Sequence, residues 1–148
     1  MARFISEIFM TLIKTRAIAG ISHITLICQD LERTTHFLKQ LLGAQEIYTS
    51  GDKTFSLSKE KFFNVAGIWI AIMEGKAIEQ SYNHIAFKVA YIDIPWFEEQ
   101  IRNLELTLLP GRRRNDAEGR SLYFYDYDNH LFELHSGDLE TRLAYYAQ

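Results

Sequence analysis

Two strand-like segments of this chain carry a histidine at the same place, and their spacing constrains the fold more than any other feature. The first segment, residues 22–28, reads SHITLIC, and the second, residues 82–89, reads YNHIAFKV. Their histidines, His23 and His84, are 61 positions apart (84 − 23). Each segment leads into a helix-like stretch and further apolar strands, so the chain contains one module twice. A module of this size cannot bury both faces of its own sheet, and two must pair.

Both halves are predicted to have the order β-α-β-β-β. Alternating apolar residues predict strands, and an apolar repeat every three to four residues predicts helices. The elements expected in the first half are strands 22–28, 45–50, 54–57 and 67–74 and helix 31–42, with residues 58–64 in a loop. Those expected in the second half are strands 84–89, 106–109, 121–125 and 131–135 and helix 94–103, before a last helix to about residue 146.

Aspartates stand where they can cap three of these helices, because their side chains accept hydrogen bonds from the free N–H groups of the first turn. They are Asp30, Asp93 and Asp138. Pro95 falls in the first turn of its helix, where proline is tolerated. Gly43 ends helix 31–42.

Composition excludes several classes of protein. With 148 residues the chain is one domain or two small half-domains, and 47% apolar residues suffice for a core. No stretch of about 20 uncharged apolar residues is present, and a net charge of −3 does not favour nucleic-acid or membrane binding. The single cysteine, Cys28, cannot form an internal disulfide, which favours a reducing cytoplasm.

Residues 1–19 form an N-terminal extension to which we assign no role. Glu7 and Lys14 interrupt its apolar residues, so we do not interpret it as a signal peptide. Residues 20–148 are expected to form a single domain made of two modules, about 21–75 and 82–137, and a C-terminal helix.

Strand geometry predicts which side chains share a face. Because side chains alternate along a strand, His23 and Thr25 share one face and Cys28 lies on the other. In the last strand Glu133 shares a face with His135. Glu133 lies between two apolar residues, and burying a carboxylate there is costly unless it is paired or bound to a metal.

His23, His84 and Glu133 together predict a metal site. Two imidazoles and one carboxylate leave coordination positions open, and this set suits Mn, Fe, Zn or Ni. Aligning the ends of the two halves places Ala71 at the position equivalent to Glu133, so the first half adds no fourth ligand. Three protein ligands with open positions indicate a catalytic rather than a structural metal.

Each histidine also has a structural alternative, because a lone strand histidine is more often a hydrogen-bonded core residue than a ligand. A repeated histidine, an inward glutamate and internal symmetry together favour the metal. His135 is a competing ligand, since it shares the face of Glu133. His36 is expected on a helix surface and His130 in the hairpin turn, both without a functional role.

Five longer segments carry a resemblance to a known family. They are residues 21–26, 50–63, 82–87, 118–126 and 129–135. The chain resembles the vicinal oxygen chelate (glyoxalase/bleomycin resistance) superfamily and, within it, the epoxide-hydrolase branch of the fosfomycin resistance proteins. The resemblance runs from about Gly20 to the C-terminus. It implies an α+β fold of paired βαβββ modules, with the modules pairing across a homodimer.

The resemblance also implies a cofactor and a reaction. His23, His84 and Glu133 would bind Mn(II), with His23 from one chain and the other two from its partner, giving two sites per homodimer. The substrate would be fosfomycin, a small epoxide with a phosphonate, hydrated to an inactive vicinal diol. Antibiotic resistance would follow. As a Lewis acid, the metal would stabilise the developing alkoxide when the ring opens.

Glu60 is the expected general base for the attacking water. Phe62 and Phe63 beside it would partly desolvate its carboxylate and raise the pKa toward a useful range. In the family this glutamate marks the hydrolase branch. The residues alone favour a solvated charge in the run Lys59-Glu60-Lys61, and the resemblance reverses that preference.

The resemblance assigns substrate contacts in both halves. The residues that match the family's phosphonate contacts are Ser121, Tyr123 and Arg142, with Arg114 or Arg113 as a second cation. Those that match its pocket walls are Trp69 and Tyr82. Structural alternatives are a surface pair of Arg142 with Asp138, solvated arginines in loop 111–119, and aromatic residues in the core.

Two other functions stay open, a glutathione or bacillithiol transferase acting on fosfomycin and a metal-free drug-binding module. Thr25 stands where bacillithiol-using relatives have a cysteine, and its hydroxyl can hydrogen-bond to a substrate oxygen. Cys28 faces away from His23 and is expected in the core. Residues 117–121 read AEGRS in place of the SEGDS-like potassium loop of glutathione-using relatives, so we expect no K⁺ activation.

Overall fold

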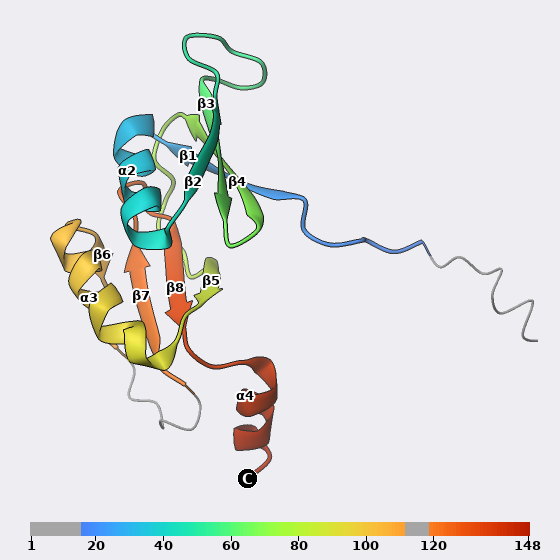
Figure 1. The fold of residues 1–148 in the computed structure, drawn as a ribbon, viewed down its shortest axis with the longest axis vertical. Helices are drawn as coiled ribbons and strands as arrows, with labels where there is room; N and C mark the ends of the chain where they lie inside the picture. Colours follow the sequence, from blue (N-terminus) through green and yellow to red (C-terminus); the bar gives the residue numbers. More distant parts are fainter. Residues whose placement is uncertain (1–15, 112–118) are drawn as a thin grey trace, which may run out of the picture.

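The computed structural model describes residues 16–111 and 119–148, which fold into two similar halves (Figure 1). The first half contains β1 (His23–Cys28), α2 (Leu31–Leu42), β2 (Gln45–Thr49), β3 (Glu60–Val65) and β4 (Ile68–Glu74). The second contains β5 (His84–Lys88), α3 (Ile94–Asn103), β6 (Thr107–Leu108), β7 (Ser121–Tyr125) and β8 (Leu131–His135), followed by α4 (Leu139–Tyr146). Each half therefore has the predicted β-α-β-β-β order.

Each half forms a four-stranded sheet with the same strand order. The order is β1-β4-β3-β2 in the first sheet and β5-β8-β7-β6 in the second. The first and last strands of each module pair in parallel, and the other pairs are antiparallel. Thr25 lies opposite Ala71 in the first sheet, and Ala86 lies opposite Glu133 in the second. The two ladders confirm that Ala71 has, in the first sheet, the position that Glu133 has in the second.

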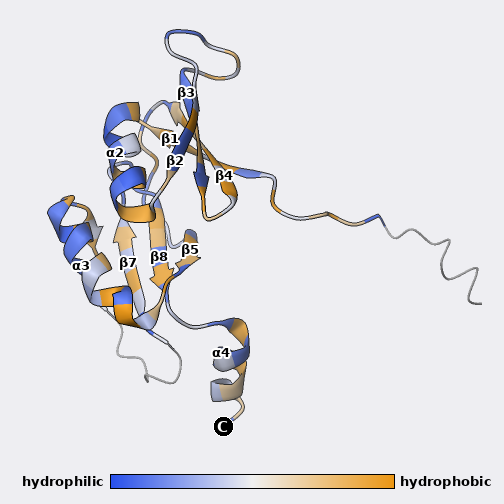
Figure 2. Ribbon diagram, in the orientation of Figure 1, coloured by the Kyte–Doolittle hydropathy of each residue, from blue (hydrophilic) through white to orange (hydrophobic). Residues whose placement is uncertain are grey.

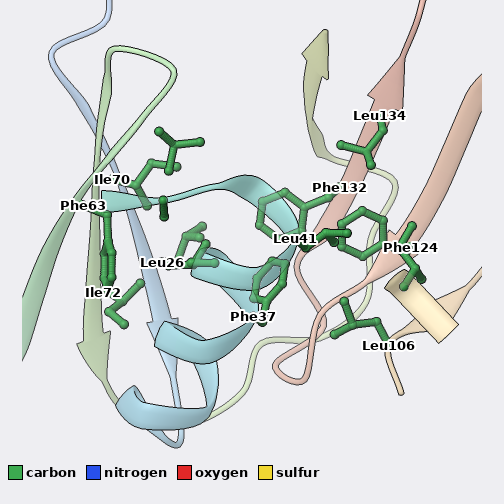
Figure 3. Close-up of a cluster of buried hydrophobic side chains, with 14 of the residues drawn as sticks. Leu26, Phe37, Leu41, Phe63, Ile70, Ile72, Leu106, Phe124, Phe132 and Leu134 are labelled. Carbon is green, nitrogen blue, oxygen red and sulfur yellow. The ribbon is translucent and has the colours of Figure 1, made fainter. Parts of the chain in front are cut away.

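One apolar core joins the two halves. Figure 3 shows Phe37 and Leu41 of α2 between the apolar side chains of the first sheet and those of the second. The Phe37 ring meets Phe124 and Phe132 edge-on, with centroids 6.2 and 5.6 Å apart, a favourable aromatic arrangement. Helices α2 and α3 carry mostly hydrophilic residues on their outer surfaces (Figure 2). The core uses one face of each sheet, and the other face remains for the histidines.

A polar seam holds the β7–β8 turn against the first half. Asp128 is fully buried, and its Oδ1 accepts hydrogen bonds from the backbone N and side-chain Nε2 of Gln29 at 2.9 and 3.2 Å. In the same turn Asp126 accepts from the backbone N and the ring Nδ1 of His130, both at 2.8 Å. His130 therefore lies in the turn, as expected, where it is buried and paired with Asp126.

Residues 54–64 differ from the prediction. Residues 54–57 form a loop rather than a strand, and the expected loop 58–64 is largely strand β3. The charged run Lys59-Glu60-Lys61 concealed the alternation. Lys61 is buried because Glu32 and Glu46, which are distant in sequence, pair with its ammonium at 2.7 and 3.3 Å. A buried charge is tolerated only with such partners.

Two of the three expected capping aspartates cap their helices. Asp30 and Asp138 accept hydrogen bonds from backbone N–H groups of the first turn at 3.0 and 2.8 Å. Asp93 makes no such bond, because a 3-10 turn over Tyr91–Asp93 leaves it in a helical conformation, whereas a capping residue needs an extended one. Gly43 ends α2 in the left-handed conformation, with φ 62°. No helix in the described ranges is long and apolar enough to cross a membrane.

Candidate active site

His84 and Glu133 meet on the second sheet, where the edge strand β5 pairs with β8. His84 Nε2 lies 3.0 Å from Glu133 Oε2. On the other side of the ring, Nδ1 lies 2.8 Å from the backbone carbonyl of Tyr82. A carbonyl only accepts, so Nδ1 carries a proton. A neutral ring with this tautomer presents the Nε2 lone pair beside a carboxylate oxygen, and these two donors fit a divalent cation.

The surroundings of Glu133 keep it ionised although it is buried. Ser121 donates a hydrogen bond to Oε1 at 2.7 Å. Burial alone raises the pKa of Glu133, but hydrogen bonds from Ser121 and Tyr123, with the imidazoles of His135 and His84 beside the carboxylate, outweigh it. The pKa therefore lies below the usual range of a glutamate. A carboxylate that stays charged is ready to bind a metal.

His23 lies on the first sheet, apart from the His84–Glu133 pair. Its ring packs on Trp69 with centroids 4.3 Å apart, and Ser22 Oγ lies 3.1 Å from its Nδ1. Within the part of the chain that the structure describes, no three His, Cys, Asp or Glu residues lie close enough together to hold a metal. One chain thus brings together two of the three expected ligands.

Glu60 begins β3 and is buried, with 8% of its surface exposed. Its backbone is held by Ser50, whose Oγ accepts from Glu60 N at 3.0 Å. The register places Glu60 opposite Met73 in β4, and alternate pairs of the same ladders are Phe62–Ala71 and Thr25–Ala71. Glu60 therefore shares a sheet face with Thr25 and His23. The interpretation as a solvated charge is wrong for Glu60.

Aromatic side chains cover the face that carries His23. Trp69 contacts Phe62 as well as His23, and Phe62 in turn contacts Tyr48, with ring centroids 5.1 and 5.0 Å apart. Trp69 and Phe62 also line a cavity of about 430 Å³ beside Ile47. Trp69 is 41% exposed. It lies at the surface of this face rather than in the core.

Tyr123, an expected phosphonate contact, and Tyr82, an expected pocket wall, lie beside His84. Tyr123 lies 5.4 Å and Tyr82 5.1 Å from the His84 ring, measured between centroids, and the two tyrosines stack at 6.1 Å. Burial, first of all, raises the pKa of Tyr123, so its hydroxyl stays protonated and able to donate. Ser121 stands across β7–β8 from His135. Arg113 and Arg114 lie outside the described residues.

Arg142 reaches the same group of residues from α4. Its Nη2 lies 3.5 Å from His135 Nε2. Asp138, the partner in the surface-pair alternative, instead caps α4 through Thr141 N. Sequence reasoning placed His135 only as a competing ligand. The structure places its Nδ1 2.8 Å from Ser121 Oγ, and the signal for this contact was the face that His135 shares with Glu133.

The remaining histidine and cysteine take no part in these groups. His36 is exposed on α2, as expected. Cys28 is fully buried on the core face of β1, and burial raises the pKa of its thiol to about 11. A neutral buried thiol is a poor nucleophile. The prediction that Cys28 belongs to the core is confirmed.

Residues 20–134 match the family model described as Glyoxalase/Bleomycin resistance protein/Dioxygenase superfamily. This match agrees with the two βαβββ modules. Fold and site together define a protein of that superfamily.

Curated and solved relatives narrow the assignment. The chain is 58% identical over 130 residues to the fosfomycin resistance protein FosX of Listeria monocytogenes, covering 87% of this chain and 98% of that protein. It is 36% identical over 136 residues to the metallothiol transferase FosB of Staphylococcus epidermidis, covering 88% and 93%. A crystal structure of a mutant Listeria monocytogenes FosX, complexed with Mn(II) and 1S,2S-dihydroxypropylphosphonic acid, superimposes with a TM-score of 0.80 at 52% identity, covering 88% of this chain and 99% of that chain. The chain belongs to the FosX family of fosfomycin resistance proteins.

Proposed function

We propose that this protein is a Mn(II)-dependent hydrolase that opens the epoxide of fosfomycin to a vicinal diol and so confers resistance. The observation that carries the proposal is the His84–Glu133 pair, 3.0 Å apart, in a chain 58% identical to FosX. A FosX relative binds Mn(II) with a dihydroxypropylphosphonic acid. That compound is the product expected when water adds to an epoxypropylphosphonate.

The metal would be held by His84 and Glu133 of one chain and His23 of a second copy. The arrangement is supported by the separate sheets that carry these residues and by the exposed ring of Trp69 beside His23. When bound, Mn(II) supplies Lewis-acid stabilisation of the negative charge that develops on the epoxide oxygen. A homodimer would then contain two shared sites.

Glu60 is the proposed base. It takes one proton from the water that attacks the epoxide carbon as that carbon–oxygen bond breaks, so the water oxygen becomes one hydroxyl of the diol. The opened epoxide oxygen takes up a proton, released again by Glu60 through solvent, and becomes the other hydroxyl. Its burial and its place on the face of His23 support this role. Thr25, on the same face, donates a hydrogen bond to a substrate oxygen.

Ser121, Tyr123 and Arg142 bind the phosphonate in this proposal. Two hydroxyls and a guanidinium offer charge-assisted hydrogen bonds to an oxyanion. Their positions around Glu133 support the assignment. Arg114 supplies a second cation, and Trp69 and Tyr82 form walls of the pocket.

A thiol transferase is the alternative favoured by the identity to FosB. Thr25 in place of the thiol-associated cysteine argues against it. Purified protein is incubated with fosfomycin and Mn(II), with no thiol or with glutathione or bacillithiol. We expect diol formation without thiol. Turnover that requires a thiol would show a transferase instead.

The single buried thiol of Cys28 supports a cytoplasmic location.

Titration with Mn(II) distinguishes a metal-free drug-binding module from the proposed metal-dependent hydrolase. The lowered pKa of Glu133, and the position of His84 beside its carboxylate, favour a bound cation. We expect Mn(II) to bind with one ion per chain when free Mn(II) is followed by electron paramagnetic resonance. Tight fosfomycin binding without stoichiometric Mn(II) would identify the protein as a binder.

A further inference from the structure

We propose that His135 is a positioning residue that couples the phosphonate-binding arginine to the metal-binding carboxylate. The inference rests on the proposed function. His135 lies between two groups to which that function gives different roles. Its Nε2 lies 3.5 Å from Arg142 Nη2, and its Nδ1 lies 2.8 Å from Ser121 Oγ. Ser121 Oγ in turn lies 2.7 Å from Glu133 Oε1.

The direction of each hydrogen bond in this row follows from the chemistry of its ends. An arginine guanidinium only donates, so Nε2 of His135 accepts and the ring proton is on Nδ1. In the protein without bound phosphonate, Nδ1 then donates to Ser121, and the single hydroxyl proton of Ser121 goes to Glu133. Glu133 is an ionised acceptor at the other end. One neutral tautomer of His135 therefore satisfies all three bonds.

The same arrangement excludes His135 as the third metal ligand. Its Nδ1 is occupied by Ser121, and its Nε2 faces the guanidinium of Arg142. A divalent cation at Nε2 would meet the positive charge of that guanidinium. These hydrogen bonds instead indicate that the His135 ring orients its two neighbours, Arg142 and Ser121.

Arg142 depends on such a contact because its helix is not anchored in the core. No residue of α4 is buried, and Leu139 and Leu143 are 71% and 56% exposed. Figure 1 shows α4 set apart from both sheets at the end of the chain. His135, in contrast, stands on strand β8, which pairs with both β5 and β7, and its side chain is only 12% exposed. A rigid ring on a central strand holds a long flexible side chain in the direction that an anion needs.

The test replaces His135 by phenylalanine, which keeps a ring but makes neither bond. We expect KM for fosfomycin to rise about tenfold, the effect of losing one hydrogen bond to a charged group, with a smaller change in kcat. The Mn(II) affinity, measured by paramagnetic resonance, should stay within about threefold. His135→Gln, whose amide oxygen can accept from Arg142, should restore part of KM. His36→Phe, on an exposed helix surface, is the matched control.

A double-mutant cycle identifies coupling rather than a general structural effect. Arg142→Ala should raise KM in the wild-type background and have a much smaller effect in His135→Phe, because the arginine is already misdirected. Additive effects, or an unchanged KM in His135→Phe, would overturn the proposal. If His135→Phe does not fold, His135→Leu, which also makes neither bond, serves in the same cycle. Protection by methylphosphonate against thermal unfolding gives a second measure of phosphonate binding, which does not require the protein to hydrate fosfomycin.

Discussion

At the residue scale, the site is set by how each side chain is desolvated and paired. Glu133 and Glu60 are both buried carboxylates, and hydrogen bonds from Ser121 and Tyr123 lower the pKa of Glu133. Glu133 therefore stays charged, which suits its proposed role as a metal ligand. Glu60 lies on the other sheet, and its proposed role is proton transfer.

Glu60→Gln should separate chemistry from binding. The amide keeps the size of the side chain but cannot take a proton, so hydration should fall roughly 10²- to 10⁴-fold. Mn(II) binding should not change, because Glu60 is not among the proposed ligands. Diol formation and paramagnetic resonance check the two effects. Wild-type turnover in Glu60→Gln would exclude Glu60 as the base.

Glu133 should also make the stability of the metal-free protein depend on pH. Its pKa is lower in the folded state than in the unfolded state, so its ionised form favours folding. This contribution is fully present above the usual glutamate pKa of about 4.3. It is lost as the pH falls through the lowered folded-state value. Urea unfolding of wild type and Glu133→Gln should show a difference that shrinks below about pH 4. A constant difference would contradict this.

At the scale of elements, the helices and strands depend on contacts that differ even where the sequence looks alike. Asp30 and Asp93 stand before helices at equivalent places, yet only Asp30 caps its helix through a side-chain hydrogen bond. Strand β3 can hold the buried Lys61 because Glu32 and Glu46, from other elements, pair with its ammonium.

The two aspartates form a matched pair for measuring a helix cap. Asp30→Ala should lower the free energy of unfolding by about 1 kcal/mol, the usual value of an N-cap. Asp93→Ala should change it by at most about 0.5 kcal/mol, the usual limit for a surface substitution. Urea denaturation followed by circular dichroism compares them. Equal losses would show that Asp93 also caps its helix.

At the scale of the whole molecule, the site faces are left open in a single chain. Trp69 of the first half stays exposed beside His23, and Tyr82 of the second half stays exposed beside His84. Large apolar side chains that remain exposed together often mark an interface. These two faces fit the proposed pairing of the first half of one copy with the second half of another.

Complementation tests this pairing. His23→Ala and Glu133→Ala should each be inactive alone, since each removes a proposed ligand. Co-expressed in equal amounts, they form mixed dimers as about half of all dimers, and one of the two sites in each mixed dimer has all three ligands. About a quarter of wild-type activity should therefore return in the mixture, and about half in the purified mixed dimer. Tagging each variant and purifying the mixed species checks its composition. No recovery in a verified mixed dimer would place the site within one chain.

The sequence by itself determined the repeat, the β-α-β-β-β order and the face on which each candidate residue lies. These follow from local rules, because alternation along a strand and the residues that end a helix are properties of neighbouring positions. His23, His84 and Glu133 could be singled out in this way. So could Ala71 as the place without a ligand.

The tertiary structure decided what depends on residues far apart in the chain. Strand β3 required acidic partners for Lys61 from α2 and β2. The meeting of His84 with Glu133, and the position of His135 between Arg142 and Ser121, required strand pairing and the approach of α4. Such contacts form only when distant segments pack, because hydrogen bonds and ion pairs act over a few ångströms in space and not along the sequence.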